Sequence, residues 1–143
     1  MNPLKEIVLR GNDPTGHGHY GANRGKRKHF GVDLLAEHGT EVLAPFSGFI
    51  TKHGYVYKNN TEIRLIEITG DVYRTYLMYG TLSAGIEVGD RVFTGDVIGT
   101  VQNIAGHHGG KMKNHLHYQL WKHGLLTDPE PLIIPFNSEN LES

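Results

Sequence analysis

The sequence contains no cysteine, no long apolar run and almost no net charge, and each absence excludes a class of site or partner. Without cysteine the protein has neither a disulfide nor a thiolate metal site, so any metal must be held by nitrogen and oxygen ligands. The formal net charge of −1 provides no general attraction to nucleic acid. No apolar run approaches the roughly 18 residues of a membrane span, so we expect no membrane insertion.

The length and the abundant glycine and histidine of the chain favour one turn-rich domain with metal ligands. The chain has 143 residues, 38% of them hydrophobic and 20% charged, which suits one domain over residues 1–143. We expect its core over about 20–132 and a flexible tail over 133–143, and we expect a monomer. The chain also has 19 glycines, which suit tight turns, and 10 histidines, which invite metal ligation.

Short runs rich in β-branched and aromatic residues, separated by turn signals, predict an all-β fold. No segment shows a helical period, and residues 11–31 are Gly-rich without any period, so we expect a long N-terminal loop there. The predicted strands cover Val42–Pro45, Gly48–Tyr55, Ile63–Thr69, Val72–Tyr79, Arg91–Phe93, Val97–Gln102 and His115–Trp121.

A weak internal repeat indicates how these strands are arranged. GTEVLAPFSGFI (Gly39–Ile50) and GDRVFTGDVIGTV (Gly89–Val101) each have a Gly-led turn, a short Val-containing strand, a second turn and another strand. Two such hairpin units predict a sheet folded on itself as a small antiparallel β-sandwich or barrel.

Two distant stretches carry the residues best suited to chemistry. KHFGVDLL places His29 and Asp33 four residues apart, and NHLHYQL places His115 and His117 two apart. Residues two apart on a strand face the same side, so His115 and His117 project together while Leu116 points into the core. His29 and Asp33 also share a face if their segment is extended, and Gly31 lets the backbone approach closely.

Imidazole and carboxylate groups in this combination suit zinc with one open coordination position. Any three of the four side chains would satisfy the ion, which leaves the fourth to act as a base. Either short motif alone is more often a surface or core feature than a ligand set. Their joint presence in apolar, strand-like surroundings favours the metal site, because buried histidines need partners.

Together these stretches resemble the lysostaphin/LytM-type zinc endopeptidases, which cut peptides in bacterial peptidoglycan. HFGVD is similar to the H-x-G-x-D motif of that family, and HLHYQL to its H-[LV]-H-[FY]-x motif. The two hairpin units, the ending TDPEPLI and the segment YGANRGKRK also resemble the family pattern, so the likeness spans about residues 20–132. The segment YGANRGKRKHFGVDLL is similar to the branch that includes leukocyte cell-derived chemotaxin and phage and bacterial relatives.

The resemblance implies a role for each motif residue. His29, Asp33 and His117 would bind Zn²⁺, and His115 would be the catalytic histidine. Tyr20 resembles a tyrosine that helps to stabilise the oxyanion, but its spacing to His29 is not a firm match and the sequence slightly favours an ordinary loop aromatic.

Two basic residues of the predicted loop are further candidates. Arg24 and Arg27 could steady that loop or meet an anionic stem-peptide carboxylate, or they could be solvated surface charges.

One position departs from the family pattern. The family carries a second catalytic histidine in a Y-x-H-L-S stretch, and here the corresponding run YGTLS has Thr81 in its place. A hydroxyl cannot exchange protons near neutral pH as imidazole does, and a lost acid or base costs about 10²–10⁴ in rate. His107 or His108, in the glycine-rich GHHGGKMKN, could substitute, or they could be exposed loop residues. The remaining histidines (His17, His19, His38, His53 and His123) have no motif support, and we expect them at the surface.

Three functions follow, in decreasing order of support. The first is a zinc endopeptidase acting on peptidoglycan peptides, and the second is a zinc-containing binding module with a weak or inactive site. The third, a biotinyl- or lipoyl-type carrier, suits the repeated hairpins but requires a lysine at a hairpin tip between them. The opening MNPLKEIVLRGNDPTG lacks the apolar segment of a signal peptide. We therefore expect delivery to the cell wall or periplasm through a phage particle, a lysis system or contact-dependent secretion.

Overall fold

The computed structural model describes residues 1–9, 30–108 and 113–134, together with the backbone of four short strands between residues 12 and 28. Of residues 107 and 108 the backbone alone is described. The ten strands after residue 30 are β5 (Val32–Leu35), β6 (Glu41–Leu43), β7 (Gly48–Tyr57), β8 (Asn60–Thr69), β9 (Tyr73–Met78), β10 (Gly80–Leu82), β11 (Arg91–Val92), β12 (Val97–Val101), β13 (His115–Lys122) and β14 (Leu125–Thr127). Two 3₁₀-helices, η1 (Ala105–His108) and η2 (Glu130–Leu132), complete these elements. No helix among the described residues has the length and apolar character needed to cross a bilayer.

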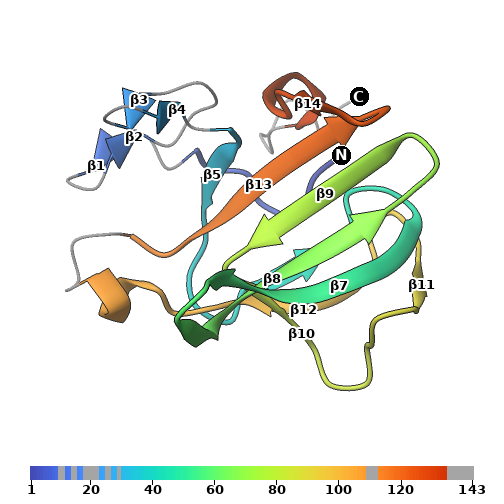
Figure 1. The fold of residues 1–143 in the computed structure, drawn as a ribbon, viewed down its shortest axis with the longest axis horizontal. Helices are drawn as coiled ribbons and strands as arrows, with labels where there is room; N and C mark the ends of the chain where they lie inside the picture. Colours follow the sequence, from blue (N-terminus) through green and yellow to red (C-terminus); the bar gives the residue numbers. More distant parts are fainter. Residues whose placement is uncertain are drawn as a thin grey trace.

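The prediction of an all-β antiparallel sandwich is confirmed (Figure 1). One sheet runs in the order β11-β7-β8-β9-β13-β14, with β5 also paired to β13, and a smaller sheet runs β10-β12-β6. Every pairing between these strands is antiparallel. Each of the seven predicted strands corresponds to an observed one.

The segment predicted as a loop over residues 11–31 contains four two-residue strands. β1 (Asn12–Asp13) pairs with β2 (Gly16–His17), and β3 (Asn23–Arg24) pairs with β4 (Arg27–Lys28). Strands of two residues cannot show an alternation, and these four, unlike β11, lie in no repeat unit that would reveal them.

The two repeat units pair with each other across the molecule. β6 of the first unit pairs with β12 of the second, and β7 of the first pairs with β11 of the second. Gly39 and Gly89 lead the two units with φ of 89° and 100°, a left-handed conformation that glycine adopts without steric cost. The repeat in the sequence therefore corresponds to two interlocked hairpin units that join the two sheets.

One apolar cluster joins both sheets. Val42 and Ile98 of the small sheet and Ile66 and Leu116 of the large sheet belong to it, and all four are fully buried. Because β13 alternates, burying Leu116 and Tyr118 leaves His115, His117 and Gln119 facing the opposite side. The core thus determines which face of β13 carries the candidate site.

Candidate metal and catalytic site

The candidate site lies where β5 pairs with the first half of β13. In this register His117 is the direct partner of Asp33, and His115 is the partner of Leu35. The two motifs, more than eighty residues apart in sequence, are therefore adjacent in the sheet, as expected (Figure 1). Gly31 makes this approach possible, since a Cβ there would lie 2.6 Å from the Tyr118 carbonyl oxygen.

Asp33 is the central acidic group of the site and is 1% exposed. Its Oδ1 lies 2.8 Å from Nδ1 of His117, and its Oδ2 lies 3.7 Å from Nε2 of His115. Both histidines therefore direct one ring nitrogen toward the same buried carboxylate.

The tautomer of His115 follows from its second nitrogen. Nδ1 of His115 lies 2.8 Å from the carbonyl oxygen of Lys113, which can accept a hydrogen bond but not donate one. Nδ1 therefore carries the proton, and in the neutral ring Nε2 has the lone pair. Because His115 is 2% exposed, this lone pair is held in a fixed position beside Asp33. A nitrogen presented in this way is suited to accept a proton.

Both ring nitrogens of His117 have a polar partner. Its Nε2 lies 3.0 Å from the side-chain amide of Gln119, which can donate through its nitrogen or accept through its oxygen. Its Nδ1 lies 2.8 Å from Oδ1 of Asp33, and because a carboxylate only accepts, Nδ1 carries a proton in this contact. A metal ion bound at Nδ1 would take the place of that proton. The donor set, imidazole nitrogen with carboxylate oxygen, is one that zinc binds.

His29, the remaining member of the proposed ligand set, lies outside the described residues, as does Tyr20. Within the described part of the chain, no three histidine or acidic side chains form a group that could hold a metal ion on their own. Asp33 and His117 thus fit zinc as two ligands of a set whose third proposed member is His29.

The other predicted site residues are placed by their backbone alone. Arg24 and Arg27 are direct register partners in the β3–β4 pair. His107 and His108 are the last two residues of η1. Their side chains lie outside the described atoms, so their suggested roles stay predictions.

The prediction that His53 is an ordinary surface residue is wrong. His53 on β7 is half-buried, and its Nε2 lies 3.0 Å from Oγ1 of Thr81 and 3.3 Å from the backbone nitrogen of Leu82. Since the Leu82 N–H can only donate, Nε2 accepts both hydrogen bonds and the ring is neutral. Burial, and to a smaller extent the charge of Arg64, lower the pKa of His53 below its ordinary value. The threonine at the position of the family's histidine therefore has a histidine as its partner.

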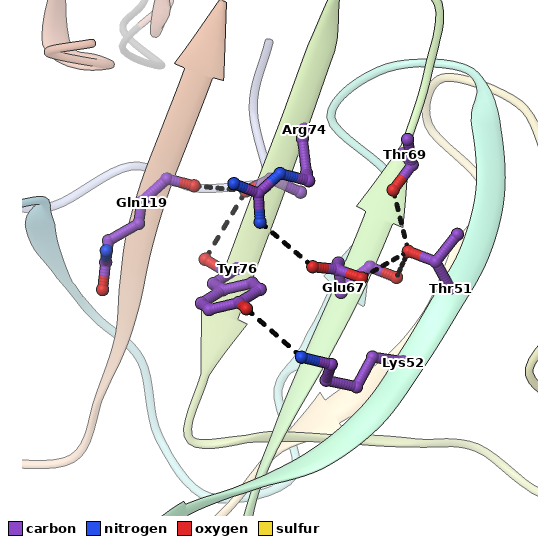
Figure 2. Close-up of polar contacts among 8 residues, drawn as sticks. Thr51, Lys52, Glu67, Thr69, Arg74, Tyr76 and Gln119 are labelled. Atoms are coloured by element: carbon purple, nitrogen blue, oxygen red, sulfur yellow. Dashed lines mark hydrogen bonds and ion pairs between the residues drawn. The ribbon is translucent and has the colours of Figure 1, made fainter. Parts of the chain in front are cut away.

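A polar and aromatic strip continues from His117 along the same face of the large sheet (Figure 2). Gln119 pairs with Tyr76 and Trp121 pairs with Arg74, and paired residues lie on one side of a sheet. Figure 2 shows the polar contacts of this strip, whose labelled members are Thr51, Lys52, Glu67, Thr69, Arg74, Tyr76 and Gln119.

The contacts within this strip are specific. The Arg74 guanidinium lies 4.0 Å from the ring centre of Trp121 and 3.2 Å from Oε2 of Glu67. The Lys52 ammonium donates to the Tyr76 hydroxyl at 3.3 Å. Sequence reasoning missed these residues, although the alternation of Arg74, Tyr76 and Met78 in β9 places them on one face and could have identified them. These residues lie beyond His117 on the same face of the large sheet.

Comparisons with known proteins agree with this geometry. The sequence model described as Peptidase family M23 matches residues 27–129. Glycyl-glycine endopeptidase ALE-1 of Staphylococcus capitis is 32% identical over 123 residues, covering 82% of this chain and 32% of that protein. Leukocyte cell-derived chemotaxin-2 of Bos taurus is 30% identical over 112 residues, covering 78% and 72%.

A solved structure, the antimicrobial peptidase lysostaphin from Staphylococcus simulans, superposes with a TM-score of 0.63 at 26% identity, covering 92% of this chain and 53% of that chain. The chain spans 32% of the full length of ALE-1 and 24% of that of lysostaphin. Since the family model covers most of the sequence and includes both motifs, this chain belongs to peptidase family M23.

Proposed function

We propose that this chain is a zinc-dependent endopeptidase that hydrolyses peptide cross-links or stem peptides of bacterial peptidoglycan. The observation that carries the proposal is the direct pairing of Asp33 with His117, with His115 beside them. The relative ALE-1 is named as a glycyl-glycine endopeptidase, which supports hydrolysis of a peptide bond. The proposed place of action is the cell wall or the periplasm, where such peptides lie.

Each residue has a distinct proposed role. His29, Asp33 and His117 would hold the ion, which when bound acidifies water and polarises the carbonyl that is attacked. His115 would take a proton at Nε2 and return it to the leaving amine. The hydrogen bond from its Nδ1 to the Lys113 carbonyl oxygen keeps that tautomer ready and stabilises the charged ring. The strip beyond His117 would receive the peptide on one side of the cleaved bond.

A second candidate function is a zinc-containing binding module with weak or no hydrolysis. The contact that favours it is the hydrogen bond from the Thr81 hydroxyl to His53, because a hydroxyl engaged in this way does not replace an imidazole as a proton carrier. The similarity to chemotaxin-2 over most of that protein's length is in line with this alternative.

Digestion of purified cell walls distinguishes the two functions. The endopeptidase predicts released peptides that disappear when a chelator removes the metal and return when zinc is added back. Asp33→Asn should abolish release, whereas Asp71→Asn, a matched change of an exposed carboxylate, should not alter it. Release that a chelator leaves unchanged rules out the zinc enzyme, and zinc binding without release supports the binding module.

Restoring the family's histidine provides a further test. If Thr81 limits proton transfer, Thr81→His should raise the rate of hydrolysis by about tenfold or more, since a positioned acid or base contributes about 10²–10⁴. Thr81→Asn is the matched control, because it introduces a polar side chain that cannot exchange protons. An equal rate in both variants would show that position 81 does not limit the reaction.

A further inference from the structure

Tyr79 has an unusual backbone conformation next to the candidate site. Its φ is 71°, and among the described residues Tyr79 and His123 are the two with positive φ that are not glycine. His123 precedes Gly124 in the β13–β14 turn, where two positive φ values are a common arrangement. Tyr79 lies between β9 and β10, and a bulky side chain in this conformation indicates a functional constraint.

Backbone hydrogen bonds hold Tyr79 in this conformation from both sides. Its N–H donates to the Arg64 carbonyl oxygen at 2.9 Å, and its carbonyl oxygen accepts from the Gln102 N–H at 2.8 Å. Thr81 and Leu82, which follow Tyr79 closely, both donate hydrogen bonds to Nε2 of His53. The surrounding structure therefore maintains a conformation that the residue itself disfavours.

The ring of Tyr79 lies against the imidazole of His115. The two ring centres are 5.1 Å apart and the planes cross at 78°, an edge-to-face arrangement that aromatic pairs favour. The hydroxyl of Tyr79 lies 3.2 Å from that of Tyr57, and the ring packs with Ile63 and Ile104. The tyrosine ring is thus fixed at its hydroxyl end and along its side, and it limits how the imidazole can turn.

We propose that Tyr79 is a positioning residue for His115, and that Tyr57 locks its ring in place. The left-handed backbone turns the ring onto the imidazole, and the ring keeps Nε2 of His115 directed toward Asp33. This inference rests on the proposed hydrolysis, in which His115 carries the proton. With a threonine at position 81, the orientation of His115 matters more, because small displacements of a catalytic group cost large factors in rate.

Tyr79→Gly is the decisive variant, because glycine adopts positive φ freely and therefore keeps the turn while removing the ring. We expect kcat on a defined muropeptide to fall roughly tenfold or more with little change in KM. Tyr79→Phe retains the ring and should stay within about threefold of the wild-type kcat. Tyr55→Leu removes an exposed tyrosine from β7, the strand that carries Tyr57, and serves as the matched control.

A readout independent of activity separates this inference from the proposed function. In the full chain, NMR of the His115 Nδ1–H, which is bound to the Lys113 carbonyl oxygen, should show slow exchange in the wild type. Exchange should be much faster in Tyr79→Gly, which removes the ring, and somewhat faster in Tyr57→Phe. Tyr79→Phe removes the same hydrogen bond between the two hydroxyls and should match Tyr57→Phe. Unchanged exchange in Tyr79→Gly and in Tyr57→Phe would overturn the inference, and Tyr57→Phe alone decides it if Tyr79→Gly does not fold. If the wild type does not hydrolyse peptide, the proposed function is contradicted. The NMR measurement still tests whether Tyr79 positions His115.

Discussion

Gln119 lies two residues after His117 on the same face of β13 and contacts the ring of that histidine. Its side-chain amide lies 3.0 Å from His117 Nε2 and holds the ring with Nδ1 directed toward Asp33. Groups that orient a metal-binding histidine in this way typically contribute about 10–100-fold in metal affinity. Gln119 therefore acts on the proposed metal through the ring of His117.

Replacing Gln119 tests this role. Gln119→Leu should weaken zinc binding by about 10–100-fold, whereas Gln119→Glu, which keeps an accepting oxygen, should bind at least as tightly as the wild type. The measurement is the dissociation constant for zinc, obtained by competition with a chelator of known affinity. Equal affinity in the leucine variant would show that His117 does not depend on this contact.

His53 makes the stability of the fold depend on pH. Burial and the nearby Arg64 lower its pKa in the folded state, so the unfolded chain binds the proton more readily. Stability from this group is present above the ordinary pKa of 6.5 and is lost as the pH falls from 6.5 through the lower folded pKa. Protonation also removes the lone pair that accepts hydrogen bonds from Thr81 and Leu82.

Thermal unfolding measured between about pH 8 and about pH 5 tests this dependence. The melting temperature of the wild type should fall more on acidification than that of His53→Gln. His38→Gln, which replaces an exposed histidine, should behave as the wild type does. Parallel curves for the wild type and His53→Gln would contradict the assignment of a neutral, accepting ring.

At the scale of the elements, the features that could be predicted from the sequence were those encoded by a pattern of residues that repeats within a few positions. The alternation in HLHYQL correctly places Leu116 in the core and His115 with His117 on the other face. The contact of His53 with Thr81 and that of Tyr79 with His115 join residues 28 and 36 positions apart, and no local pattern encodes them. β5, β10 and β14, with three or four residues each, were not predicted, whereas β6 and β11, which are no longer than these, were predicted because each belongs to a repeat unit.

The pairing of β5 with β13 depends on the absence of a side chain at Gly31. A Cβ there would lie 2.8 Å from His117 Nε2 and 2.9 Å from Gln119 Cγ, in addition to its 2.6 Å contact with the Tyr118 carbonyl oxygen. Distances this short force the strand or the side chains to move. The displacement would occur two residues before Asp33, within the site itself.

Gly31→Ala should therefore reduce both stability and zinc affinity. Forcing an additional methyl group into a packed position costs about 1–3 kcal/mol, which chemical unfolding in urea will detect. Gly106→Ala is the matched control, since a Cβ at that exposed position meets nothing within 4 Å. A stable Gly31→Ala protein with unchanged zinc binding would show that β5 can shift without affecting the site.

At the scale of the whole molecule, the N-terminal residues close the core behind β13. Leu4 is 1% exposed and belongs to the main apolar cluster, and the Pro3 carbonyl oxygen accepts a hydrogen bond from the Leu43 N–H at 2.7 Å. The Met1 carbonyl oxygen accepts from the Tyr118 hydroxyl, and the Met1 ammonium donates to the Leu132 carbonyl oxygen. Tyr118 lies between His117 and Gln119, so these contacts support the strand of the site from its opposite face.

Leu4→Ala should lower the free energy of unfolding by about 2–5 kcal/mol, because it removes a fully buried side chain and leaves a cavity. Leu9→Ala, at a residue that is 49% exposed, should change it by less than about 0.5 kcal/mol. Since Leu4 packs behind the sheet, we expect zinc affinity to remain unchanged in both variants at temperatures where they are folded. Loss of zinc affinity in a folded Leu4→Ala protein would show that the position of His117 depends on the core behind β13 as well as on its pairing with β5.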